Sequence, residues 1–247
     1  MSIKRVLFVV AMEAEASPFV SALSLAPCKS VFPASLPFRS FSGSHNGLDV
    51  TVVTSGKDAT YSTGVDNVGT LPAGVMTTLA LQSSSFDLCI NAGTCGGFSR
   101  KGAEIGSVFL TKGAAFHDRR IDIPGTPFKD YGTGKMESLS TTNLQAAIGA
   151  HEGICSTSDS LDHDERDDER MEFNDTSVKD MESAAIHWAC NICNVPHFGV
   201  KVVTDIVDGE RPSAEQFMEN LGSAAKKLQE TLPKVLNFVA GKEIKDL

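Results

Sequence analysis

The stretch that indicates the fold of this chain is VLFVVAMEAEA, residues 6–16. Its first five residues are all apolar, as expected for a strand that is buried on both faces of a sheet. The acidic residues that follow belong to a helical pattern, which we expect over Met12–Leu23. A buried strand that leads directly into a helix is typical of α/β proteins with parallel strands.

The same alternation of apolar runs and helical patterns continues along the chain. Strands are predicted at Leu48–Thr54, Leu88–Ala92, Val108–Thr111 and His197–Val203, and helices at Val68–Leu81, Glu182–Cys193 and Ser213–Leu232. In the last helix Ser213 and Gln216 have capping-box spacing, and Pro233 should kink or end it. No repeat or linker divides the sequence, so we expect one domain over residues 1–247, with a largely parallel sheet covered by helices on both faces.

The composition narrows the choice of partners and compartment. A net charge of −9, from 22 basic and 31 acidic residues, argues against nucleic acid or an anionic membrane as the main partner. The first apolar run is too short to span a bilayer, and Glu13 and Glu15 interrupt the region where a signal peptide would be cleaved. We therefore expect a cytoplasmic protein whose six cysteines are reduced thiols.

The cysteine pair and the histidines could indicate redox chemistry or a metal site, but both have simpler interpretations. Cys190 and Cys193 have redox-motif spacing, but they lie inside a predicted helix, whereas redox pairs lie at helix N-termini. Core-facing thiols are the better interpretation. The histidines show no metal-ligand spacing, so we expect neither a metal nor a cofactor.

Four groups of polar or glycine residues lie where predicted strands end or helices begin. They are Ala11–Glu15, Asn91–Gly97, Lys179–Glu182 and Thr204–Asp205. Ligands of open parallel sheets bind beyond the carboxyl ends of the strands. An acid at the end of a buried strand is partly desolvated, which favours its use as a proton donor.

Each group has a simpler explanation when taken alone. Glu15 and Glu182 could be first-turn acids favoured by a helix dipole, and Asp205 could be an N-cap. The glycines of residues 93–97 could form only a tight turn, and they match neither common phosphate-binding pattern. The acidic run over residues 162–172 is interpreted as a solvated helix face or a mobile loop. The coincidence of four groups at strand ends favours a functional site.

At these residues the chain resembles the nucleoside phosphorylase/hydrolase family, and in particular its plant-type methylthioadenosine nucleosidases. The matching stretches, in the order of the family, are AMEAEA (11–16), NAGTCGG (91–97), FHDRR (116–120), STSDSLD (156–162), KDMESAA (179–185) and VTDIVDG (203–209). The resemblance implies a three-layer α/β/α sandwich around a mixed, mostly parallel sheet. This agrees with the fold expected from the hydrophobic pattern.

The resemblance also implies an activity. It is hydrolysis of the N-glycosidic bond of 5′-methylthioadenosine to adenine and the thio-substituted ribose, in methionine salvage. Such a reaction passes through a sugar with oxocarbenium character. By resemblance, Asp205 protonates the leaving base and must hold a proton near neutral pH. Glu15 activates water, and Glu182 binds the ribose hydroxyls while its charge favours the cationic sugar.

Further substrate-binding residues follow from the same resemblance. They are Met12, Thr94, Cys95, Gly96, Leu161, Lys179, Asp180 and Met181, with Glu182. The family usually forms homodimers in which a loop of the neighbour closes the pocket around the 5′ group, and Ile121 and Pro124 would supply that loop here. Lys201 and Leu161 replace an arginine and a phenylalanine of bacterial relatives, which leaves open whether S-adenosylhomocysteine is also a substrate.

Two alternative functions remain at this point. A purine nucleoside phosphorylase would use phosphate in place of water, but it would need cationic residues to bind the oxyanion. The first loop offers Glu13 and Glu15 instead. A catalytically silent storage or binding relative would be expected to lack one of the three acids, and all three are present.

Overall fold

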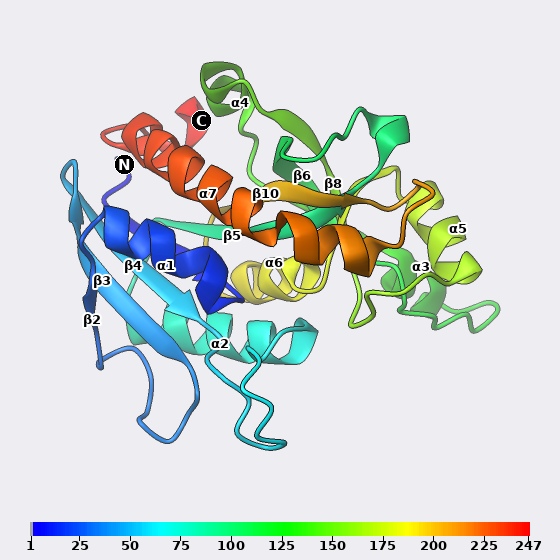
Figure 1. Cartoon of the computed structure of the whole chain (residues 1–247), viewed down its shortest axis with the longest axis horizontal. Coiled ribbons are helices and arrows are strands. Elements are labelled where there is room, and N and C mark those ends of the chain that lie inside the picture. Colours follow the sequence, from blue (N-terminus) through cyan, green and yellow to red (C-terminus); the bar gives the residue numbers. More distant parts are fainter. Residues whose placement is uncertain (1) are drawn as a thin grey trace.

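The computed structural model describes residues 2–247 as an α/β structure around a large sheet (Figure 1). The strands are β1 (Arg5–Val10), β2 (Ala26–Pro27), β3 (Arg39–His45), β4 (Leu48–Thr54), β5 (Leu88–Gly97), β6 (Val108–Phe116), β7 (Lys135–Glu137), β8 (His151–Thr157), β9 (Thr176–Asp180) and β10 (His197–Ile206). The helices are α1 (Glu13–Ala22), α2 (Thr70–Ser83), α3 (Phe128–Thr133), α4 (Thr142–Ile148), α5 (Glu165–Phe173), α6 (Ser183–Ile192) and α7 (Ser213–Val239).

The sheet is mixed, as predicted, and part of it closes on itself. Parallel pairs join β4, β1, β5 and β10 in that order, and also β6, β8 and β9. Antiparallel pairs join β10 to β6 and β9 to β5. Strands β5, β10, β6, β8 and β9 therefore form a closed circuit, with β5 also bonded to β1.

Helices cover both faces of the sheet and produce the predicted three layers. In Figure 1, α1 and α7 lie on one side of the central strands, and α2 and α6 lie on the other. The alternating residues of β1 separate the two cores. Phe8 packs in the cluster that contains Phe19 of α1 and Leu228 of α7, whereas Leu7 packs in the cluster that contains Met76 of α2. Both faces of β1 are thus buried, which explains its continuous apolar sequence.

The glycine-rich segment after residue 92 is an extended strand, so its interpretation as a tight turn is wrong. Strand β5 continues through Gly97 and pairs with β10 over its whole second half. A Cβ atom at Gly97 would lie 2.6 Å from the Cβ of Ala103 and 2.9 Å from a methyl group of Val203. Glycine is required there because side chains from neighbouring segments approach the backbone closely.

Two expectations for the last helix, an end at Pro233 and a capping box at its start, are contradicted, whereas the kink that Pro233 could also produce stays a prediction. Helix α7 continues through Pro233 to Val239, because Leu232, Leu236 and Val239 remain buried against the core on both sides of the proline. That packing outweighs the cost of a proline inside a helix, which is about 3 kcal/mol. The capping box does not form either, because the N-cap residue is Pro212 and the Gln216 side chain bonds instead to backbone groups of Ile206 and Arg211.

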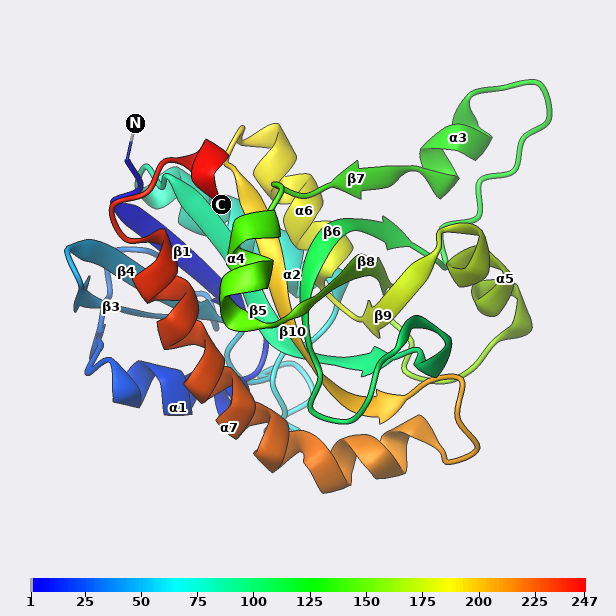
Figure 2. The same cartoon turned by 90° about the horizontal axis from the view of Figure 1, so that it is seen from above.

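Several elements that the sequence did not predict lie together at one end of the molecule. Figure 2 shows β7, α3 and α5 together at the end opposite α1. The acidic run contains the helix α5, which is one of its two predicted forms.

All six cysteines are free thiols, with Cys190 buried and Cys193 half-buried. Over residues 2–247, no helix combines the length and apolar character needed to cross a membrane.

Candidate active site

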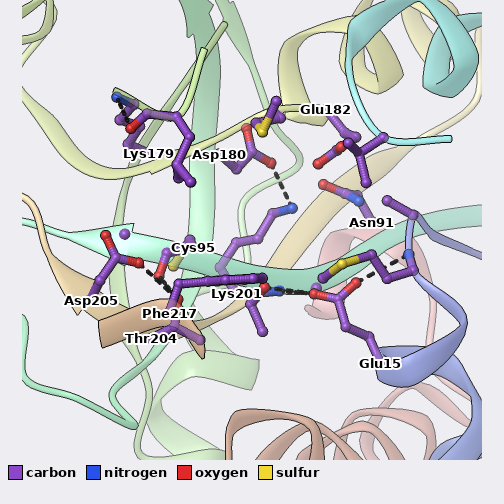
Figure 3. Close-up of a pocket in the computed structure, with 18 of the residues that line it drawn as sticks. Glu15, Asn91, Cys95, Lys179, Asp180, Glu182, Lys201, Thr204, Asp205 and Phe217 are labelled. Atoms are coloured by element: carbon purple, nitrogen blue, oxygen red, sulfur yellow. Dashed lines mark hydrogen bonds and ion pairs between the residues drawn. The ribbon is translucent and has the colours of Figure 1, made fainter. Parts of the chain in front are cut away.

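The four predicted groups meet in one cavity of about 250 Å³ (Figure 3). It lies where β1, β5, β9 and β10 end, as expected for a sheet of this kind. The cavity is lined by Ala11, Met12, Glu15, Val68, Asn91, Ala92, Gly93, Thr94, Cys95, Gly96, Leu161, Lys179, Asp180, Met181, Glu182, Lys201, Thr204, Asp205 and Phe217.

Glu15 is held at the start of α1, directly after β1. Its Oε1 accepts hydrogen bonds from the backbone N–H of Thr94 at 2.6 Å and from the Thr94 hydroxyl at 2.7 Å. Its Oε2 accepts from the N–H of Met12 at 3.3 Å. Burial raises the pKa of Glu15, although the bonds from Thr94 oppose that shift. The hydrogen bonds therefore fix the orientation of the carboxyl group. Burial moves its pKa toward the range in which a general base works near neutral pH.

Asp205 lies where β10 is irregular, since the pairing of β10 with β5 shifts between Val203 and Asp205. The carboxyl group is buried, with 3 % of the residue exposed. Its Oδ1 accepts a hydrogen bond from the Thr204 hydroxyl at 2.8 Å. A Cβ atom at Gly96 would lie 2.8 Å from Oδ2, so the glycine leaves room for this carboxyl group. Asp205 is not an N-cap, because the next helix begins at Ser213.

Glu182 stands before α6, and its carboxyl group reaches the first turn of α2. Its Oε1 accepts from the N–H of Gly69 at 2.8 Å. Asp159 occupies the same helix start, accepting from the N–H and the hydroxyl of Thr70, both at 2.6 Å. Burial raises the pKa of Glu182 to about 7, and the negative charge of Asp180 adds to the effect. Glu182 therefore titrates in the physiological range.

Beneath these acids, Asp180 and Lys201 form a buried ion pair. The Nζ of Lys201 lies 2.7 Å from Oδ2 of Asp180, and both side chains are almost fully inaccessible. Burial opposes both charges, yet mutual attraction lowers the pKa of Asp180 and raises that of Lys201. The carboxyl group of Asp180 also accepts from the Thr157 hydroxyl at 2.6 Å and from the N–H of Ser183 at 3.0 Å. This ion pair links the end of β9 to β10 through side chains.

The structure brings together every predicted site residue except Ile121 and Pro124, which lie outside the cavity of their own chain. Val68 and Phe217 line the cavity but were not predicted. They come from the approach to α2 and from α7, and nothing in their local sequence separates them from ordinary helix residues. Asn91 belonged to a predicted group, and its amide donates to the carbonyl oxygen of Val9 at 3.1 Å.

Among residues 2–247, no three His, Cys, Asp or Glu side chains are grouped so that they could hold a metal ion. The polar groups that line the cavity include four carboxyl groups, the hydroxyl groups of Thr94 and Thr204, and two lysines. This arrangement can donate a proton, accept a proton and bind hydroxyl groups of a ligand.

Comparison with known proteins places the chain in a family. Residues 5–237 match the family model described as the phosphorylase superfamily. The chain belongs to this superfamily, as the resemblance in its motifs predicted.

Within the superfamily, the chain is similar to nucleosidases of Arabidopsis thaliana. A 5′-methylthioadenosine nucleosidase is 43 % identical over 246 residues, which cover 99 % of this chain and 91 % of that protein. A 5′-methylthioadenosine/S-adenosylhomocysteine nucleosidase is 42 % identical, covering 99 % and 95 %. The solved apo structure of the Arabidopsis 5′-methylthioadenosine nucleosidase superposes with a TM-score of 0.95 over 100 % of both chains, at 42 % identity.

Proposed function

We propose that this protein hydrolyses the N-glycosidic bond of 5′-methylthioadenosine, releasing adenine and the 5-methylthio sugar. The observation that carries the proposal is the convergence of Glu15, Glu182 and Asp205 on one cavity. The three acids come from different elements and are held by different partners, so each can take a separate role. Membership of the phosphorylase superfamily and the identity to the Arabidopsis nucleosidases support the choice of substrate.

The roles follow from what the reaction needs. Departure of the base leaves positive charge on the ribose, and the leaving nitrogen base must gain a proton. Asp205 is the proton donor to the base in this proposal. Glu15 takes a proton from the attacking water, for which its raised pKa suits it. Glu182 accepts hydrogen bonds from ribose hydroxyls, and its negative charge stabilises the developing cation.

Water rather than phosphate suits the electrostatics of the cavity. The N–H groups at the start of α2 could bind an oxyanion, but Glu182 and Asp159 already occupy them. The positive charge of Lys201 is committed to Asp180. The ammonium group of Lys179 donates to the carbonyl oxygens of Leu161 and Asp162, and no arginine is among the residues that line the cavity, so a phosphate dianion would meet carboxylates without an arginine to bind it.

The direct test is adenine release from 5′-methylthioadenosine, measured by chromatography in phosphate-free buffer and again with added phosphate. We expect the same rate in both buffers, with a free reducing sugar as the second product. A strict requirement for phosphate, with a sugar 1-phosphate as product, would replace this proposal by a phosphorylase. S-adenosylhomocysteine assayed in parallel determines whether the larger tail is also accepted.

We also propose that the chain works as a homodimer with a single domain per subunit. Helices α2 and α6 present an apolar face to solvent, where Leu71 is 76 % exposed and Trp188 48 % exposed. A second copy would bury this face, and its loop with Ile121 and Pro124 would reach the 5′ end of the cavity. We also propose a cytoplasmic location, which the six free thiols support.

A further inference from the structure

Strand β9 contains a lysine at a position where lysine is rarely found. All five residues of the strand are buried, and only 8 % of Lys179 is exposed. Lysine is almost never buried without polar partners, because removing its ammonium group from water is costly. The partners of Lys179 therefore indicate what the buried charge does.

Those partners are two backbone carbonyl oxygens. The Nζ of Lys179 donates to the carbonyl oxygen of Asp162 at 2.9 Å and to that of Leu161 at 3.3 Å. Within residues 2–247, no carboxylate forms an ion pair with this ammonium group. Lys179 thus differs from Lys201, the other buried lysine of the cavity, whose charge is paired with Asp180.

The segment that Lys179 holds is irregular and lies at the cavity mouth. Between the end of β8 and the start of α5 the chain forms neither helix nor strand. Leu161 lines the cavity although 44 % of it is exposed. In the described part of the chain, the two bonds from Lys179 are the only hydrogen bonds made by the main chain of residues 161–163.

The position of Lys179 connects this segment to one end of the cavity. Figure 3 shows Lys179 and Asp205 on one side of the cavity, and Glu15 and Glu182 on the other. In the proposed reaction, the side of Asp205 receives the purine base. The segment with Leu161 therefore covers the base, and its geometry depends on a buried lysine behind it.

We propose that Lys179 is a positioning residue, which fixes the segment of residues 161–163 over the purine base and thereby sets the affinity for adenine. It acts through the main chain of that segment and does not bind the base itself. This inference rests on the proposed function for the identity of the base. It assigns to Lys179 a role different from that of a direct substrate ligand.

The test compares Lys179→Met, which removes all donors, with Lys179→Arg, which keeps them. Adenine binding is measured by calorimetry, and hydrogen exchange is followed in peptides that contain residues 160–164. We expect Lys179→Met to weaken adenine binding and raise KM about tenfold, with kcat changed less than about threefold, since ground-state recognition is lost. Exchange of the segment should accelerate, and Lys179→Arg should restore much of the affinity.

Lys112→Met is the matched control, because Lys112 lies on β6 with its side chain 62 % exposed and does not line the cavity. It should leave adenine affinity and exchange of residues 160–164 unchanged. If Lys179→Met folds poorly, Lys179→Gln, which keeps an uncharged NH2 donor group, gives an intermediate exchange rate and affinity.

Unchanged adenine affinity in Lys179→Met would overturn the inference. So would lost affinity with unchanged exchange of the segment, because the lysine would then contact the base directly. Neither readout requires catalysis. Wild-type protein that binds adenine but does not cleave 5′-methylthioadenosine would therefore refute the proposed function and leave the role of Lys179 intact.

Discussion

The floor and the mouth of the cavity are built in different ways. The floor consists of the acids Glu15, Asp180, Glu182 and Asp205, which lie at strand ends and helix starts, and Glu15, Asp180 and Asp205 are each at most 6 % exposed. The mouth includes Val68, 42 % exposed, and Leu161, 44 % exposed, from segments outside the sheet. The difference teaches that the proposed chemistry lies on the rigid scaffold, while recognition of the substrate uses loosely held chain.

Hydrogen bonding accounts for that difference. Strand β5 is bonded to β1 on one side and to β10 on the other, and it supplies the Thr94 groups that fix Glu15. In the described part of the chain, the main chain of residues 161–163 is hydrogen-bonded only to Lys179. Substitutions on the floor should therefore change catalysis strongly, whereas those at the mouth should change affinity moderately.

The largest effect is expected from the two floor acids assigned to proton transfer. Asp205→Asn and Glu15→Gln should each lower kcat about a hundredfold or more, the usual contribution of acid or base catalysis. Steady-state adenine release measures both. Glu13→Gln is the matched control, because Glu13 lies on the same helix but is paired with Arg39 and Lys57 and does not line the cavity. Activity close to wild type in either floor variant would remove the assigned role.

A smaller effect is expected on the pH dependence of stability, because the carboxyl group of Glu182 is buried in the folded protein. The pKa of Glu182 is about 7 in the folded protein, against an ordinary value of 4.5. Between these values the folded state binds more protons than the unfolded state, so stability should decrease as the pH rises through this window. Thermal unfolding without ligand from pH 5 to 8 measures the trend. Glu182→Gln removes this titration and should make the trend shallower, leaving the contribution of Glu15, whose pKa burial also raises. An equally steep trend in that variant would refute the assignment.

The smallest effect is expected at the mouth. Leu161→Ala removes apolar contact with the base, so we expect KM to rise about three- to tenfold. Because Leu161 is 44 % exposed, the melting temperature should change little. A fall in kcat as large as that of the floor variants would break the distinction between floor and mouth.

The floor was also the part that the sequence predicted well. Strand β1 is a continuous apolar run because both of its faces are buried, and β4, β5 and β10 each contain a buried apolar stretch. The acids and glycines at the ends of β1, β5 and β10 are distinctive. The predicted ends of β5 and β10 fell short of the observed ones, because glycine and threonine continue the strands without an apolar signal.

The elements around the mouth could not be predicted in the same way. Strand β9 reads TSVKD, and its polar side chains are buried through specific partners rather than through apolar packing. Val68 and Phe217 reach the cavity only because the segment before α2 and the first part of α7 lie against it, which is a property of the tertiary arrangement. Local patterns carry no information about such long-range contacts.

The contacts that hold the floor acids join residues far apart along the chain. Glu15 and Thr94 are separated by 79 positions, and Glu182 and Gly69 by 113. Closing such long loops is slow, and the entropy lost is recovered only when the strands between them have paired. In refolding from denaturant, recovery of enzymatic turnover should therefore be among the last events, and it would report completion of the native topology more faithfully than circular dichroism.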